Sequence, residues 1–339
     1  MRPIRTILIA VVALGVAGIV GASGPRTLTR AGELYSVGIR DNQVVVTARL
    51  ADGTASELFV PQSAAAVPSS VQVGVDETTG ALYVLWQKKT GAEARLRLAG
   101  YLDGTWIGPT TFTGNDGTAA YNPQLLVHRA VSTITEDLGE DEEPVTTEIA
   151  TTFLHLVWWS QTSEYDVGVA RYAAVALDED GVPQFGTAET VDLIDFLPFG
   201  TACSDTFDVD NLRHPKLFID PKTGNPHVFA TDLSYCVFQI LELRPEIVEE
   251  DEGAEKRRRQ IIILRQGSMI AVRSDIPFAT SRLAIGRGLK LIMHWDSEDE
   301  GILNYLELDR DGISETKSLT LGETLNHEQA VELIRGLTN

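Results

Sequence analysis

The stretch VQVGVDETTGALYVLW, from Val71 to Trp86, decides the fold prediction. It contains two short apolar segments, residues 71–75 and 81–86, on either side of an Asp-Glu-Thr-Thr-Gly segment. Apolar runs of this length are typical of β-strands, and a segment with Asp and Gly between them is typical of a hairpin turn. We therefore expect a β-hairpin over residues 71–86.

Similar pairs of apolar segments recur along the chain. They are residues 123–128 with 153–158, 215–219 with 226–230, and 281–285 with 289–293. A third, alternating segment follows each pair, at residues 94–101, 167–172, 237–243 and 302–308. Asp-Gly turns then introduce a weak fourth segment, and residues 33–62 form a degenerate further copy. The pattern predicts five four-stranded units of about 58 residues each.

A four-stranded sheet cannot bury both of its faces alone, and packing such sheets face to face around an axis solves this problem. We therefore predict an all-β fold, a β-propeller of about five four-stranded blades, with six as the alternative count. A β-sandwich, or a stack of two sandwiches, is the competing fold. The propeller is expected to span residues 23–325, and residues 326–339 are expected to form a helical tail on the surface.

The first residues have the pattern of a secretory signal. Arg2 and Arg5 precede an uncharged apolar run from Ile7 to Val20, which small residues follow. We expect residues 1–22 to be a signal peptide and the mature protein to be periplasmic or extracellular. The apolar run of about 14 residues is shorter than the roughly 20 that a membrane span needs. An uncleaved N-terminal membrane anchor is the alternative.

The chain is strongly acidic, with 48 Asp and Glu against 28 Lys and Arg and a net charge of −20. This balance argues against nucleic acid as a partner, because the phosphate backbone requires a basic surface. Acidic insertions near residues 134–148 and 245–259 interrupt the repeat, and we expect them to be solvated hairpin tips. The second could pair an acidic arm with the basic segment 256–259. A docking surface or a cation site is the alternative. No cofactor is expected, and calcium binding at these insertions stays open although no motif supports it.

Cys203 and Cys236 are the two cysteines of the chain. An even pair in an exported protein predicts a disulfide, which would stabilise the fold by roughly 3–4 kcal/mol. Two buried thiols are the first alternative and a metal site is the second.

The second strands carry the motifs of a known family. Residues 154–159 (LHLVWW) and 82–86 (LYVLW) share an apolar pattern that ends in Trp, and residues 102–106 (LDGTW) look like a fragment of an Asp-box turn. The chain thus resembles the sialidase-like (BNR-repeat) β-propellers of exported bacterial proteins, which implies a propeller fold and glycoside hydrolase activity. The family's Arg-Ile-Pro signature is matched only by the interrupted segment Arg273–Pro277, so no catalytic residue is carried over.

The candidate ligand-binding residues lie at the ends of the second strands. They are Trp86, Trp159, Asp232, Trp295 and Asp296. In a propeller these ends converge near one end of the axis, where exposed Trp rings stack on sugars and carboxylates accept hydroxyl hydrogen bonds. The alternative is that Trp at a repeated position, including Trp158, packs between blades.

His155 and His227 occupy matching positions of two units, and we expect them to lie between neighbouring blades or on the central tunnel. A metal site formed by these two is the alternative, which we do not predict. His128 and His214 lie in or just before first strands and are interpreted as structural.

Three functions remain on these grounds. The first is a non-catalytic propeller that binds a carbohydrate or an envelope protein at one end of its axis. The second is a divergent sialidase-like glycoside hydrolase that uses carboxylates such as Asp232 and Asp296 at that end. The third is an envelope assembly scaffold whose acidic insertions dock a partner.

Overall fold

The structure is a computed structural model of the whole chain. It describes residues 26–28, 33–50, 52–90, 93–112, 118–136, 145–161, 168–188, 190–193, 215–219, 224–232, 237–252, 255–271, 282–285, 291–297, 301–309, 312–322, 330 and 333–334. Outside these ranges lie the predicted signal peptide, both cysteines, His214, the segment Arg273–Pro277 and the first acidic tip. Within them, no helix is long and apolar enough to cross a membrane.

The described residues form five antiparallel sheets, numbered here in chain order. Sheet 1 contains β1 (Arg26–Leu28), β2 (Leu34–Arg40), β3 (Gln43–Arg49) and β4 (Ala55–Phe59). Sheet 2 contains β5 (Gln72–Val75), β6 (Leu82–Thr90), β7 (Glu93–Leu102) and β8 (Thr105–Phe112). Sheet 3 contains β9 (Ala119–Glu136), β10 (Val145–Gln161), β11 (Gly168–Ala176) and β12 (Thr190–Asp192).

Sheet 4 contains β13 (Lys216–Ile219), β14 (Pro226–Asp232), β15 (Val237–Glu252) and β16 (Glu255–Ala271). Sheet 5 contains β17 (Arg282–Ile285), β18 (Leu291–Asp296), β19 (Ile302–Asp309), β20 (Gly312–Ile313) and β21 (Lys317–Thr320). Short 3-10 helices, η1 (Pro68–Ser70) and η2 (Phe185–Thr187), lie in the connections.

Each sheet is a meander in which every strand pairs with the one before it in the chain. Sheet 5 differs only at its edge, where β20 and β21 both pair with β19. The predicted first, second and third strands all coincide with observed strands, and the all-β prediction is confirmed. The period of apolar residues was a sufficient signal because each hairpin turn is short and local.

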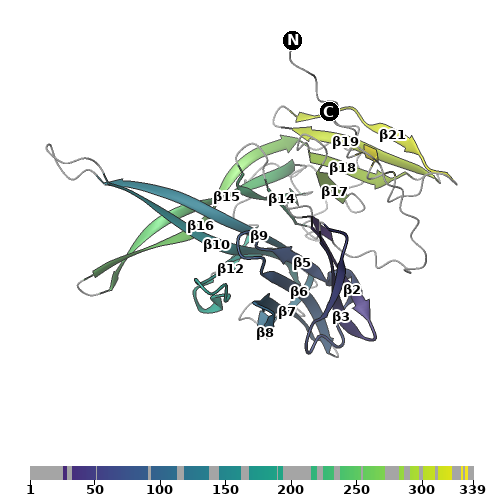
Figure 1. Ribbon diagram of the computed structural model, residues 1–339. Helices are drawn as coiled ribbons and strands as arrows, with labels where there is room; N and C mark the ends of the chain where they lie inside the picture. The colour runs from purple at the N-terminus through teal and green to yellow at the C-terminus, as the bar shows by residue number, and fades with distance from the viewer. Residues whose placement is uncertain are drawn as a thin grey trace, which may run out of the picture.

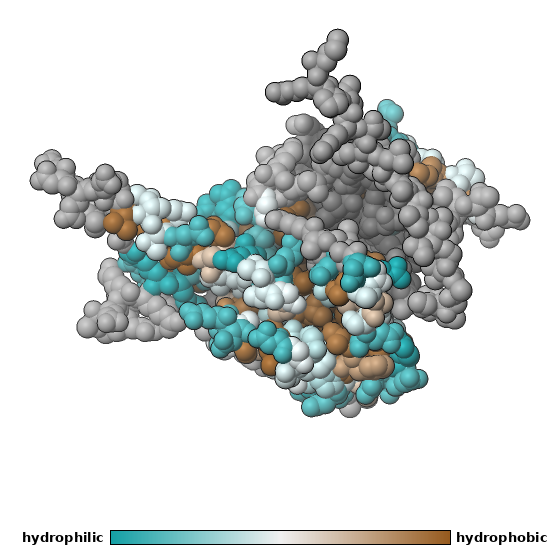
Figure 2. All heavy atoms as spheres, viewed as in Figure 1, coloured by the Kyte–Doolittle hydropathy of each residue, from teal (hydrophilic) through white to brown (hydrophobic). Residues whose placement is uncertain are grey.

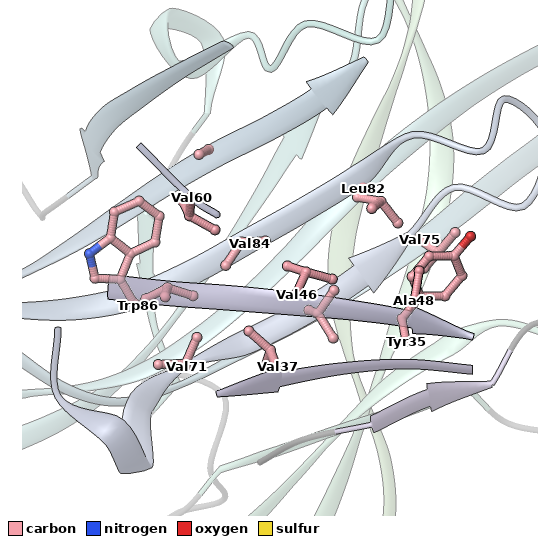
Figure 3. Packing of buried hydrophobic residues seen from close by; sticks show 13 residues of the cluster. Tyr35, Val37, Val46, Ala48, Val60, Val71, Val75, Leu82, Val84 and Trp86 are labelled. Carbon is pink, nitrogen blue, oxygen red and sulfur yellow. The ribbon is translucent and has the colours of Figure 1, made fainter. Parts of the chain in front are cut away.

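Apolar side chains fill the space between consecutive sheets from sheet 1 to sheet 4. Figure 3 shows Val37 and Val46 of sheet 1 facing Val84 and Trp86 of sheet 2. A second cluster joins sheet 2 to sheet 3, and a third joins sheet 3 to sheet 4. The core is therefore a series of layers between sheets rather than one central mass.

The first strands of successive sheets lie next to one another: β1 contacts β5, β5 contacts β9, and β9 contacts β13. Figure 1 shows the sheets following one another around an arc, with sheet 5 on the same side of the molecule as sheet 1.

The C-terminal tail was expected to lie on the surface, but part of it is buried. Ala330, Leu333 and Ile334 are helical, and the side chains of Ala330 and Ile334 are fully covered. They pack with Ile292, Leu303 and other residues of sheet 5. Positions 330 and 334 are one helical turn apart, so they share the face that meets the sheet.

Candidate functional site

Two long β-ribbons project from the body of the protein. Strands β9 and β10 pair without interruption from Phe153 outward to the pair Glu136 and Val145, well beyond the end of their neighbour β11. Strands β15 and β16 likewise extend past β14, out to Glu252 and Glu255. Figure 1 shows both ribbons leaving the sheets on the same side and crossing each other.

The ribbons touch where they cross. Gln260 of β16 donates a hydrogen bond from Nε2 to Ser132 Oγ of β9, with a length of 2.7 Å. Ile262 and Leu264, on the same face of β16 as Gln260, pack against the core between sheets 3 and 4. One face of each ribbon thus joins the other, and the interlayer core continues into the projection.

The other face of the β9–β10 ribbon is open to solvent. Arg129, Val131, Thr133 and Thr135 alternate with covered residues along β9, and each of the four is exposed. Val131 keeps 51% of its surface exposed. Figure 2 shows hydrophobic residues interspersed among hydrophilic ones on the described part of the projection. The exposed face of β9 is thus mostly polar, with Val131 as the apolar side chain among these four residues.

The second ribbon carries opposite charges on its two strands. Glu249, Glu250 and Asp251 of β15 stand directly opposite Arg258, Arg257 and Lys256 of β16. Arg258 Nε donates to Glu249 Oε1 at 2.9 Å, and Arg265 donates to Glu246 at 2.7 Å. This is the extended hairpin with paired acidic and basic arms that the sequence left open. These residues continue the two strands rather than forming a long loop, and Glu249 and Arg258 are exposed, as expected for a solvated hairpin.

Two of the repeated Trp residues are fully buried. Trp86 lies in the cluster between sheets 1 and 2, and Trp158 lies in the cluster between sheets 2 and 3. The Trp158 ring meets Phe112 edge-on, with the ring centroids 5.3 Å apart. These rings pack between sheets and present no face to a ligand in this structure.

The remaining candidate residues are less uniform. Trp159 and Trp295 keep 6% and 5% of their surfaces exposed, so only a small part of each ring meets solvent. Asp296, at the end of β18, is exposed. Asp232 ends β14, and its side chain lies outside the described residues. A ligand role for these four residues stays a prediction.

A polar network that the sequence did not reveal lies near the end of β10, on the face of sheet 3 that also carries Trp158. Arg171 donates from Nε to Asp192 Oδ1 at 2.8 Å, and its Nη1 lies 3.2 Å from both Thr118 Oγ1 and Ser160 Oγ. Thr118 and Ser160 also bond to each other. The network ties β11 to β12 and to β10, on the face of sheet 3 opposite to Trp159.

His155 lies between two sheets, as expected. His155, on β10, is completely buried on the face of sheet 3 that meets sheet 4. Its Nδ1 and the Tyr172 hydroxyl are 2.7 Å apart. Burial, together with neighbouring His128, lowers the pKa of His155 to about 3. His227 stacks on Phe218 in sheet 4, with the ring centroids 5.4 Å apart.

A scan against models of known protein families finds no match to this chain, and a search of curated proteins finds no similar one. The fold and the site therefore rest on the residues themselves.

Proposed function

We propose that this protein is an exported five-bladed β-propeller that binds another protein of the cell envelope through its two crossed ribbons. The export part of this proposal rests on the N-terminal sequence pattern. The propeller part rests on five similar meanders, of which sheets 1 to 4 pack in succession with neighbouring first strands. The described residues of both acidic insertions, 134–136 with 145–148 and 245–252 with 255–259, lie in the ribbons.

Burial in the first and last sheets supports a closed ring. Val44, Val45 and Val46 of β3 are all buried, although successive residues of a strand point to opposite faces. Met293 and His294 of β18 are likewise both buried. Sheet 1 meets sheet 2 on one face only, so a second cover on its other face is expected if sheet 5 closes the ring.

The observation that carries the proposed function is the projection itself. A two-stranded ribbon is marginally stable alone, and these two are held together by the Gln260–Ser132 bond and by apolar packing. They leave an exposed face that includes Val131, and beyond the sheets their outer edges pair with no other described strand; exposed strand edges of this kind are used in recognition of protein segments. The projection thus provides a surface that a blade does not need for its own core.

Shortening the ribbons tests this proposal. Joining Ala130 to Thr151 and Ile247 to Gln260 through Asn-Gly turns removes the tips at positions that stand opposite each other. The full chain is used to capture a partner from envelope extracts, and the purified partner is then tested for binding. We expect the shortened protein to keep the circular dichroism spectrum of a β-sheet protein and no longer to bind this partner. The matched control carries Glu249→Arg and Arg258→Glu. This exchange keeps the ribbon and the ion pair between the two positions.

Equal capture by the full and the shortened chains would contradict the proposal. So would a purified partner that binds both chains with the same affinity.

A carbohydrate at the end of β10 is the second candidate. The Arg171 network and Trp159 lie on opposite faces of sheet 3 at the same end of β10, so this end of the sheet carries both polar groups and an aromatic edge. Binding to a panel of immobilised glycans, lost in Trp159→Ala, would favour this candidate. Turnover of fluorogenic glycosides, lost in Asp296→Ala, would instead favour a glycoside hydrolase.

A further inference from the structure

Two histidines of sheet 3 lie together under sheet 4. His128 on β9 and His155 on β10 face the same side of the sheet, and their ring centroids are 5.8 Å apart. Phe153 and Tyr172 flank the His155 ring at 6.1 and 6.0 Å. Burial lowers the pKa of both histidines, so both rings are neutral at neutral pH and can act as ligands.

In each ring one nitrogen forms a hydrogen bond, and the other has no hydrogen-bond partner among the described residues. The carbonyl of Gly224 accepts a hydrogen bond from His128, whose buried Nδ1 has no partner among the described residues. His155 uses Nδ1 for Tyr172, and its buried Nε2 has no partner among the described residues either. Buried polar atoms are rarely left in this state, so each nitrogen calls for an explanation. A held nitrogen on one side of each ring is the usual arrangement of metal-binding histidines.

The separation of the rings suits one small ion between them. An ion about 2.0 Å from each nitrogen, with about 1.1 Å from nitrogen to ring centre, separates two in-line rings by about 6 Å. A direct hydrogen bond of about 2.9 Å between the nitrogens would bring the centres to about 5 Å. The observed 5.8 Å is closer to the first value.

The surroundings select a monovalent ion. Among the described residues these two neutral nitrogens are the donors at hand, since no group of three His, Cys, Asp or Glu there could hold a metal. A divalent ion would need more ligands and would carry a larger desolvation cost between aromatic rings. Copper(I) and silver(I) bind two nitrogen ligands in line, and imidazole is a suitable ligand for copper.

We propose that His128 Nδ1 and His155 Nε2 bind a single copper(I) ion between sheets 3 and 4. Binding at Nε2 of His155 leaves the ring proton on Nδ1, which donates to the Tyr172 oxygen, so no proton is released. The ion would join β9 to β10 at the interface where sheet 4 packs.

Titration of the full chain with copper(I), in the presence of a chromophoric copper(I) chelator and without oxygen, tests the proposal. The variant used for this titration carries Cys203→Ser and Cys236→Ser, because the thiols would compete for the ion. We expect one equivalent to bind per chain, silver(I) to bind likewise, and zinc(II) not to bind. His155→Phe and, at a half-exposed position, His128→Leu should each abolish the binding, while His227→Gln should not. Tyr172→Phe should weaken it roughly 10- to 100-fold.

The absence of stoichiometric copper(I) binding by the thiol-free chain would overturn the proposal and indicate that water or a direct contact joins the two nitrogens. Unchanged binding in a folded His128→Leu chain would overturn it as well. Because His128 is only partly buried, its replacement keeps the test valid even if His155→Phe fails to fold.

Discussion

Gln260 and Ser132 are 128 positions apart in the chain and form a 2.7 Å hydrogen bond where the two ribbons cross. Gln260 keeps 4% of its surface exposed, so its amide has little access to water as a substitute partner. The bond joins the projecting part of sheet 3 to that of sheet 4. The contribution of this hydrogen bond to the free energy of unfolding therefore shows whether the two ribbons form one structural unit.

Ser132→Ala should destabilise the protein by about 1–3 kcal/mol, because it leaves the buried Gln260 amide without a partner. The double variant Ser132→Ala with Gln260→Leu should recover most of this loss, since no unpaired polar group remains. Urea unfolding of the two single variants and the double variant measures both effects. Strictly additive losses in the double variant would mean that the two side chains are not coupled.

Gly181→Ala should be more destabilising than Gly80→Ala. Both glycines have positive φ angles, 79° and 75°, and each alanine would carry strain of about 1–2 kcal/mol. A Cβ at Gly181 would also lie 3.1 Å from the Tyr83 hydroxyl, which donates a 2.7 Å bond to the Gly181 carbonyl, whereas nothing lies within 4 Å of a Cβ at Gly80. Thermal unfolding of both variants gives the comparison. Equal losses would show that this contact between sheets 2 and 3 adds nothing.

Acid should destabilise the protein through His155. Its pKa is about 3 in the folded protein, against an ordinary value of 6.5, so the unfolded chain binds more protons between these pH values. Stability from this group is therefore complete above pH 6.5 and falls toward pH 3, by up to about 1.4 kcal/mol per pH unit. The free energy of unfolding at pH 7.5, 5.5 and 4.5 should fall more steeply for the wild type than for His155→Phe. Parallel curves for the two chains would contradict the burial of a neutral imidazole.

We expect a disulfide bond between Cys203 and Cys236 in the exported protein. Unfolding without reductant should leave both thiols unreactive toward an alkylating reagent, and reduction should expose both. The reduced protein should melt at a lower temperature, since the loop between the two cysteines is no longer closed. Two thiols that react without reduction would exclude the disulfide.

The strands could be predicted from the sequence because their signals are local. Residues 71–86 show both apolar segments and the turn between them, and the other units repeat that pattern. The ribbons could not be predicted fully, because acidic and basic blocks such as 249–252 and 256–259 are usually solvated tips. Cross-strand charge pairing keeps these residues in strands instead.

The contacts between sheets had no signal in the sequence. Nothing local distinguishes Ser132 or Gln260 from other polar residues, and their meeting depends on how two distant hairpins cross. The burial of Ala330 and Ile334 likewise depends on the position of sheet 5 rather than on the helix itself. Trp at a repeated position was ambiguous between packing and binding, and the burial of Trp86 and Trp158 assigns these two to packing.

Closure of the ring is the central claim, and distances between spin labels on outer strands test it most directly. Labels at Ser56, Thr111, Thr190 and Ser318 would mark exposed positions of sheets 1, 2, 3 and 5 in a chain that lacks its native cysteines. In a closed ring of five, sheets 2 and 5 both neighbour sheet 1. The distance from Ser56 to Ser318 should therefore be close to that from Ser56 to Thr111 and shorter than that from Ser56 to Thr190. A distance from Ser56 to Ser318 longer than that from Ser56 to Thr190 would show an open arc and contradict the account.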